Sequence, residues 1–320
     1  MAYAAYQKGV VDCKNVAPPT NLEGKGVVIT GGASDVQRGW VRREFGLSSR
    51  QGKHYSYWSI PIYSTLTSIL RAHVTFGDLD EESGTKLETE LAPNAKFIRC
   101  DVTSWEDQLA MFKLALSSSP RKSIDVVVAN AGISGPDDAF TIEVTDTDEP
   151  VKPQLKIVNI DLLGVMYTMK LARHYFVKHP LDASHDRCLI VNASLVGFLD
   201  VPGIPQYMAS KWGCRGLMRC IRRTTVVDGV RMNLTGPWQV YCKSKGIVFA
   251  EAKDAAGAWI KIASDPSING RSFGIVPRDA APQGYMDLGK DDYADGEYLD
   301  ELQDILLRTS HRLAVKAESQ

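Results

Sequence analysis

The sequence predicts an α/β fold, a doubly wound parallel sheet with helices on both faces, and three features support this class. Continuous apolar runs such as residues 126–129 are typical of strands buried on both sides. Segments such as residues 105–117 have apolar residues at helical spacing. Six or seven such strands alternate with helices, which is the pattern of repeated strand-helix-strand units.

Composition narrows the functional classes. The chain has 320 residues, of which 44% are hydrophobic and 23% charged, as is ordinary for one soluble globular domain with appendages. A formal net charge of -1 argues against a nucleic-acid or anionic-membrane partner. There is no apolar run of about 18 residues to span a bilayer, and no signal-peptide core at the start. Six cysteines without a CxxC pair predict reduced thiols in a cytoplasmic protein and no metal site.

The first predicted strands end in residues suited to a dinucleotide. The strand over residues 27–30 runs into Gly31, and such a turn brings the backbone close to a pyrophosphate. The second strand starts at His73 and ends at Asp78, whose carboxylate can accept hydrogen bonds from ribose hydroxyls and repels a 2′-phosphate. Asp78 therefore favours NAD over NADP. The other interpretation makes Asp78 a helix N-cap, since Asp80 and Glu81 belong to the same acidic cluster.

Two further strands and a long helix complete the first part of the pattern. The third strand ends at Asp101 and Val102, and the fourth runs into Asn130, Ala131 and Gly132. A long apolar helix is expected over residues 156–176.

The stretch over residues 188–223 carries the predicted chemistry. An apolar strand over residues 189–191 is followed by Ser194, and a helix then places Tyr207 and Lys211 one turn apart on one face. A nearby ammonium favours a phenolate and lowers a tyrosine pKa from its usual value near ~10. These three groups can move a proton on or off an alcohol or carbonyl oxygen. Tyrosine and lysine four apart are common on solvated helix faces, so the added serine gives the set its specificity.

Ser194, Tyr207 and Lys211 resemble the catalytic set of the short-chain dehydrogenase/reductase family, of a fungal-like type, which has a single Rossmann-like NAD(P)-binding domain. The resemblance covers about residues 24–34 and 72–277. It implies that Tyr207 is the general acid/base, that Lys211 also holds the nicotinamide ribose, and that Ser194 orients the substrate oxygen.

The same resemblance implies roles for residues at the strand ends. Thr30 and Gly31 match the start of the family's TGxxxGxG turn, and Asp101 and Val102 would flank the adenine. Asn130, Ala131 and Gly132 match a signature beside the nicotinamide ribose, and Val240 would lie near the carboxamide. Asn159 would complete the proton relay, or would simply bond its own backbone. Pro237 with Trp238 resembles a variant of the family's Pro-Gly found among fungal members.

One segment departs from the family pattern. Asp35 and Gln37 stand where the family has its second and third glycines, and residues 35–68 lack a helical period. This segment is also about fifteen residues longer than an ordinary connection needs. We interpret residues 35–68 as foreign to the fold, from intron read-through or a faulty gene model, or else as an insertion that still permits cofactor binding.

The sequence thus predicts an N-terminal arm over residues 1–24, one domain over residues 25–277, and a C-terminal helix and tail over residues 278–320. The predicted function is NAD(P)-dependent interconversion of a secondary alcohol and a ketone on a small hydrophobic substrate, in secondary metabolism. Homodimers or homotetramers are usual for the resembling family. The alternative is a non-catalytic member whose disrupted glycine turn impairs cofactor binding.

Overall fold

The chain is described by a computed structural model that covers residues 9–14, 22–33, 71–135, 137, 139–140, 149–179, 182, 185–225, 228–237, 250 and 252–309. The interpretations of Asp35, Gln37, Trp238 and Val240, and of the segment over residues 35–68, concern residues outside those described.

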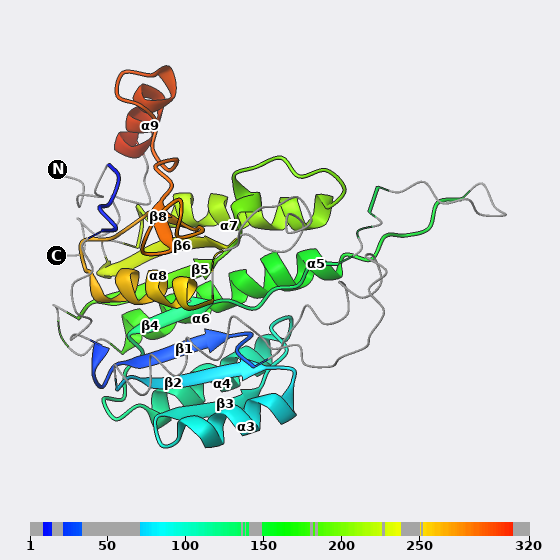
Figure 1. Cartoon of the computed structure of the whole chain (residues 1–320), viewed down its shortest axis with the longest axis vertical. Helices are drawn as coiled ribbons and strands as arrows, with labels where there is room; N and C mark the ends of the chain where they lie inside the picture. The colour runs from blue at the N-terminus through cyan, green and yellow to red at the C-terminus, as the bar shows by residue number, and fades with distance from the viewer. Residues whose placement is uncertain are drawn as a thin grey trace.

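A mostly parallel sheet forms the centre of the molecule (Figure 1). Its order is β3-β2-β1-β4-β5-β6-β7-β8, and only β8 runs antiparallel to its neighbour. The strands are β1 (Gly26–Thr30), β2 (His73–Asp78), β3 (Ala95–Arg99), β4 (Val126–Ala129), β5 (Arg187–Asn192), β6 (Val230–Pro237), β7 (Ser272–Ile275) and β8 (Tyr285–Asp287). The strand order reverses between β1 and β4, and ligands of such sheets bind outside the carboxyl ends of the strands at this point. The predicted fold class is confirmed.

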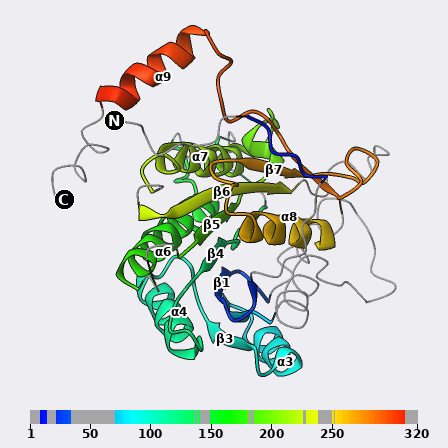
Figure 2. The same ribbon diagram turned by 90° about the vertical axis from the view of Figure 1, so that its left-hand side faces the viewer.

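Helices cover both faces of the sheet (Figure 2). One layer holds α4 (Trp105–Ser118), α6 (Val165–Lys178) and α7 (Pro205–Ile221), and the other holds α3 (Glu81–Leu91) and α8 (Ala252–Ser264). The short α5 (Lys156–Val158) continues through a π-helical turn, η3 (Asn159–Gly164), into α6. The turn η4 (Leu195–Gly197) follows β5.

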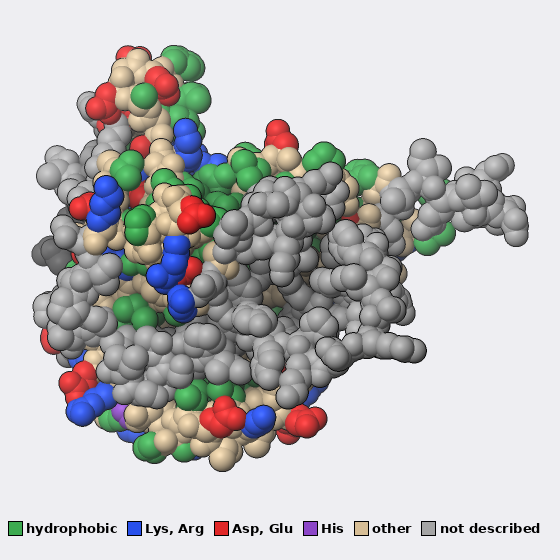
Figure 3. All heavy atoms as spheres, viewed as in Figure 1, with side chains coloured by type: hydrophobic (Ala, Val, Ile, Leu, Met, Phe, Trp, Pro, Cys, Tyr) green, Lys and Arg blue, Asp and Glu red, His purple; other side chains and the backbone are tan. Residues whose placement is uncertain are grey.

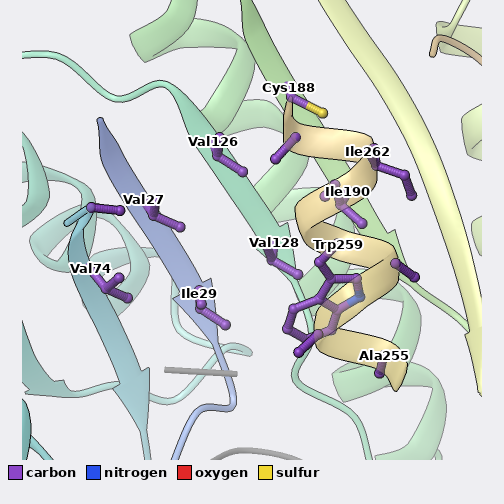
Figure 4. Close-up of a cluster of buried hydrophobic side chains, with 14 of the residues drawn as sticks. Val27, Ile29, Val74, Val126, Val128, Cys188, Ile190, Ala255, Trp259 and Ile262 are labelled. Carbon is purple, nitrogen blue, oxygen red and sulfur yellow. The ribbon is translucent and has the colours of Figure 1, made fainter. Parts of the chain in front are cut away.

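Successive side chains of each strand point to opposite faces of the sheet, so each strand contributes to two hydrophobic clusters, one on each face. Val27 and Ile29 of β1 belong to the cluster that packs against α8, where Trp259 and Ile262 are buried (Figure 4). Val28 points to the opposite cluster, under α4, α6 and α7. Burial of every residue of β1 explains why its sequence is continuously apolar.

Helix α7 carries its buried side chains at intervals of four, which turns one face to the sheet. This face consists of Gln206, Ser210, Cys214 and Met218. Pro205 fits the first turn because its missing N–H is not needed there. Lys211 lies beside this buried face and is only 3% exposed, which is unusual for a lysine and indicates a specific partner.

The described sheet extends past residue 277, where the sequence predicted the domain to end. Strand β8 pairs with β7, and the buried Arg271 binds Asp287 through Nε–Oδ2 and Nη2–Oδ1 distances of 2.8 and 3.1 Å. A three-residue strand has no detectable period, so the pattern could not reveal it. The expected C-terminal amphipathic helix is present as α9 (Tyr298–Thr309), which projects from the body (Figures 1 and 2).

Among the helices of the described residues, none is long and apolar enough to cross a membrane. In the view of Figure 3, Lys and Arg side chains alternate with Asp and Glu side chains on the coloured part of the surface. This face therefore shows no broad basic patch among its described residues.

Candidate active site at the carboxyl edge of the sheet

The ends of β1 and β4 are tied together by Thr30 and Asn130. The Thr30 hydroxyl Oγ1 accepts hydrogen bonds from the backbone nitrogens of Asn130 and Ala131, at 3.0 and 3.1 Å. In return, Asn130 Nδ2 donates to the carbonyl of Gly31 at 2.8 Å. The predicted residues of the two strand ends therefore form one unit.

Three polar residues that the sequence analysis missed continue this connection across the sheet. Asn192 Nδ2 donates to Asn130 Oδ1 at 2.8 Å, and Thr235 Oγ1 donates to Asn192 Oδ1 at 3.0 Å. Trp259 Nε1 in turn donates to Thr235 Oγ1 at 3.0 Å. Polar residues near the ends of β5 and β6 were a visible signal, but their pairing depends on strand order. The chain of hydrogen bonds fixes the edge on which the site is built.

Gly31 occupies a position that a side chain cannot share. Its φ is +67°, and a Cβ added there would lie 2.5 Å from the Ala131 Cα. Gly31 N donates to the Gly77 carbonyl at 2.8 Å, which holds the turn against β2. The first glycine of the turn is therefore required by both backbone conformation and close packing.

Asp78 supports this turn from the end of β2. Its carboxylate is 4% exposed and accepts hydrogen bonds from Ala33 N at 2.8 Å and Asp80 N at 3.0 Å. The N-cap of α3 is Asp80, which accepts from Ser83 N at 3.0 Å, so the N-cap interpretation of Asp78 is wrong.

The end of β3 is shaped by local contacts. Asp101 Oδ1 accepts hydrogen bonds from Thr103 N at 2.9 Å and Thr103 Oγ1 at 2.7 Å. Val102 is buried against Gly164, where an added Cβ would lie 3.0 Å from the Val102 Cγ2. These contacts place both residues at the carboxyl edge, and Val102 also packs against the π-helical turn.

Ser194, Tyr207 and Lys211 converge as predicted. Ser194 lies between β5 and η4, is 4% exposed, and donates from Oγ to the Pro237 carbonyl at 3.1 Å. Lys211 Nζ lies 5.0 Å from the centre of the partly buried Tyr207 ring. The nearby Ser194 side chain favours the Tyr207 phenolate and acts to lower the pKa of that phenol.

The residue that the structure places beside Lys211 is Asp161, not Asn159. Asp161 is fully buried, and its Oδ2 lies 2.8 Å from Lys211 Nζ. Asn159 is exposed, so its assignment to the relay is corrected. Side chains two positions apart on a helix point in different directions, so Asn159 and Asp161 cannot both face Lys211. The family pattern was therefore matched to the wrong residue. A carboxylate inside the apolar stretch NIDLLG was the signal that could have found it.

The net direction of the Tyr207 pKa also differs from the prediction. Burial raises the pKa of Tyr207, and Lys211 lowers it as expected, but Asp161 raises it again, and the balance lies above the usual value. Burial lowers the pKa of Lys211, but the Asp161 carboxylate, together with Tyr207 and Cys214, outweighs burial, and the Lys211 pKa is raised overall. The phenol is thus held protonated and the ammonium charged.

A strand-order switch, a glycine turn with a positive φ, and serine, tyrosine and lysine side chains that meet at one sheet edge define a Rossmann-like enzyme of the dehydrogenase class. The model of the short chain dehydrogenase family matches residues 70–248, more than half of the sequence. The chain belongs to the short-chain dehydrogenase/reductase family, which consists of oxidoreductases. The match begins two residues after the departing segment over residues 35–68.

Individual proteins agree with this assignment. A 5′-hydroxyaverantin dehydrogenase of Dothistroma septosporum is 33% identical over 315 residues, covering 90% of this chain and 94% of that protein. The NADP-dependent dehydrogenase M3 of a Phoma species is 29% identical, over 82% of this chain and 78% of its own length. A crystal structure of a short chain dehydrogenase from Mycobacterium smegmatis has a TM-score of 0.60 and 24% identity, and covers 81% of this chain and 94% of its own. This last similarity supports the fold.

The described residues fit a dinucleotide at the nicotinamide end. Gly132 has so little space that an added Cβ would lie 3.2 Å from Lys211 Nζ and 3.1 Å from Asp161 Oδ2. A side chain at this position would press on the Lys211 ammonium, which a bound nicotinamide ribose would contact.

Proposed function

We propose that this protein is an NAD(P)-dependent oxidoreductase that interconverts a secondary alcohol and a ketone on a small hydrophobic substrate. The observation that carries the proposal is the convergence of Ser194, Tyr207 and Lys211 at the carboxyl edge, next to Gly132. Family membership supports the reaction class, and the geometry supports the division of roles.

In the oxidation direction, Tyr207 takes the hydroxyl proton of the alcohol as general base. Ser194 donates a hydrogen bond to the substrate oxygen and orients it, and Lys211 stabilises the phenolate through its charge. The bound dinucleotide supplies hydride acceptance, which is the chemistry that the side chains lack. In the ketone-reducing direction, Tyr207 returns the proton to the carbonyl oxygen.

The dinucleotide would be held along the strand ends described above. Thr30 and Gly31 would face the pyrophosphate, Asp78 the adenosine ribose, and Asp101 and Val102 the adenine. Asn130, Ala131 and Gly132 would line the nicotinamide ribose, which Tyr207 and Lys211 would bind, with Pro237 and Val240 near the nicotinamide.

Asp78 supports NAD as the preferred cofactor because its carboxylate would repel a 2′-phosphate. NADP is the alternative, since one relative is named an NADP-dependent dehydrogenase.

The substrate class follows from the relatives. One of them acts, by its name, on 5′-hydroxyaverantin. We propose a related kind of substrate, a hydrophobic secondary alcohol of fungal secondary metabolism, and 5′-hydroxyaverantin is the first compound to assay.

Domain organisation and cellular context are part of this proposal. We propose that residues 25–277 form the dinucleotide-binding domain, with β8 added to its sheet, and that residues 35–68 are foreign to it. A spliced transcript that encodes residues 35–68 would contradict an origin in faulty gene annotation. A cytoplasmic homodimer or homotetramer is the expected state, which sedimentation of the purified chain measures.

The test of the mechanism is Tyr207→Phe. Removal of the hydroxyl removes general acid/base catalysis, and we expect turnover to fall by roughly 10²–10⁴-fold. NAD binding measured by calorimetry should stay within about threefold, because the ring and Lys211 remain.

The matched control is Tyr175→Phe. Tyr175 is a buried tyrosine of α6 that stacks on Phe112 at a ring-centre distance of 5.4 Å, outside the site. This variant should keep full turnover. Normal activity in Tyr207→Phe would end the proposed mechanism.

A further inference from the structure

The catalytic lysine is paired with a buried carboxylate. Lys211 Nζ and Asp161 Oδ2 lie 2.8 Å apart, and their side chains are 4% and 0% exposed. The two residues come from different elements, α7 and the π-helical turn η3. A buried pair of opposite charges holds its members in place, because separating them would leave a charge without compensation in a medium of low polarity.

Asp161 is itself fixed on both sides. Its Oδ1 accepts a hydrogen bond from the backbone nitrogen of Ile133 at 2.7 Å, just after the Asn130–Gly132 motif. Its backbone carbonyl accepts a hydrogen bond from the Cys214 thiol at 3.3 Å. The carboxylate therefore joins the end of β4 to the lysine of α7, whose ammonium lies 5.0 Å from the centre of the Tyr207 ring.

The charged and titratable groups around Tyr207 oppose one another. Lys211 and Cys214 approach from its own helix, Asp161 from the π-helical turn, and the Ser194 hydroxyl from the start of η4. Lys211 and Ser194 favour the phenolate, whereas Asp161, Cys214 and burial oppose it. A neutral side chain in place of Asp161 would leave the lysine charge unopposed.

We propose that Asp161 is a positioning residue for the alcohol–ketone reaction: it anchors the Lys211 ammonium and delays ionisation of the Tyr207 phenol to more alkaline solution. This inference rests on the proposed function and deepens it, because it makes the oxidation direction favoured at high pH. The direction of the pKa changes agrees with the geometry, since both Tyr207 and Lys211 are raised.

Asp161→Asn removes a negative charge near Tyr207, which favours the phenolate and lowers the pKa of the phenol. The active base then exists at lower pH, and the acid limb of kcat/KM for oxidation moves to lower pH. We expect a shift of about one pH unit or more, the size typical of one close charge.

The role of Asp161 can be tested by a pH titration of Tyr207 that needs no cofactor. Ultraviolet absorbance follows phenolate formation with pH in the unchanged chain and in Asp161→Asn, and each curve is corrected by the same protein carrying Tyr207→Phe. The midpoint assigned to Tyr207 should fall in Asp161→Asn. Glu88→Gln is the control, because it removes a surface carboxylate whose Oε1 lies 3.2 Å from Lys96 Nζ, and the Tyr207 midpoint should not move.

The outcomes of this titration distinguish failure of the inference about Asp161 from failure of the proposed function. An unchanged midpoint in Asp161→Asn overturns the inference, whether or not the protein turns over a substrate. A shifted midpoint in a chain that oxidises no alcohol supports the inference and counts against the proposed function. Asp161→Ser, which leaves room for water beside the ammonium, replaces Asp161→Asn if the latter does not fold. Failure of both neutral variants to fold assigns Asp161 a purely structural role and overturns the proposal.

Discussion

Substitution of Gly31 by alanine tests the close contact between the first turn and the fourth strand. Gly31 has a φ of +67°, where an L-residue is strained by roughly 1–2 kcal/mol. A new Cβ would also lie 2.5 Å from Ala131 Cα and 2.9 Å from Ala131 Cβ, so the backbone must move. Overpacking of this kind costs about 1–3 kcal/mol. We therefore expect Gly31→Ala to lower the free energy of unfolding by roughly 2–5 kcal/mol.

The matched control is Gly216→Ala. Gly216 is exposed on α7, and an added Cβ there meets no atom within 4 Å. Alanine in a helix is favoured over glycine by about 1 kcal/mol, so this variant should be slightly more stable.

Urea unfolding followed by tryptophan fluorescence measures both variants, and an equal slope with denaturant shows that they are compared on the same transition. A Gly31→Ala chain that is as stable as the unchanged protein would refute the contact with Ala131. It would also remove the reason for a glycine at this position. NAD affinity should fall in parallel, because Gly31 and Asn130 are joined by a hydrogen bond at the cofactor edge.

Two further predictions concern charged residues away from the site. Arg271→Met removes the positive charge paired with the fully buried Asp287 carboxylate, so the free energy of unfolding should fall by about 3–5 kcal/mol. Urea unfolding measures the loss, and an unchanged stability would show that this ion pair does not hold β8. Burial raises the pKa of Asp186, but the hydrogen bond to Arg231 and the nearby charges of Arg231 and Lys25 together lower it more, and the net pKa lies below the usual range. The stability from this pair is present above about pH 4, the usual carboxyl range, and is lost as pH falls through the lower folded value. In Asp186→Asn the urea midpoint should depend less on pH below about pH 4, and an identical dependence would argue against the assigned cause.

The sequence predicted the fold class, and it predicted that Ser194, Tyr207 and Lys211 lie close together, because both depend on local patterns. Continuous apolar strands identify a sheet buried on both faces. The i, i+4 spacing of Tyr207 and Lys211, with Ser194 at the end of the preceding strand, requires only one strand, one loop and one helix. These three residues meet in the structure as the spacing indicated.

The differences arise where distant segments meet. Asp161 approaches Lys211 through a π-helical turn, and the facing of a residue in such a turn does not follow the ordinary helical period. The net pKa of Tyr207 depends on that same carboxylate and on burial, so the neighbouring lysine alone gave the wrong direction. The Asn192–Thr235–Trp259 connection requires knowledge of strand order, and β8 is too short to have a pattern.

The central claim is tested most directly by calorimetric titration of the purified chain with NAD and with NADP. The proposed site predicts saturable binding of one NAD per chain, with weaker binding of NADP because of Asp78. The same titration on a chain trimmed of residues 35–68 and given the family's glycine turn shows whether that segment impairs the site. Failure of the unchanged chain to bind either dinucleotide would contradict the claim that this polypeptide is a working oxidoreductase.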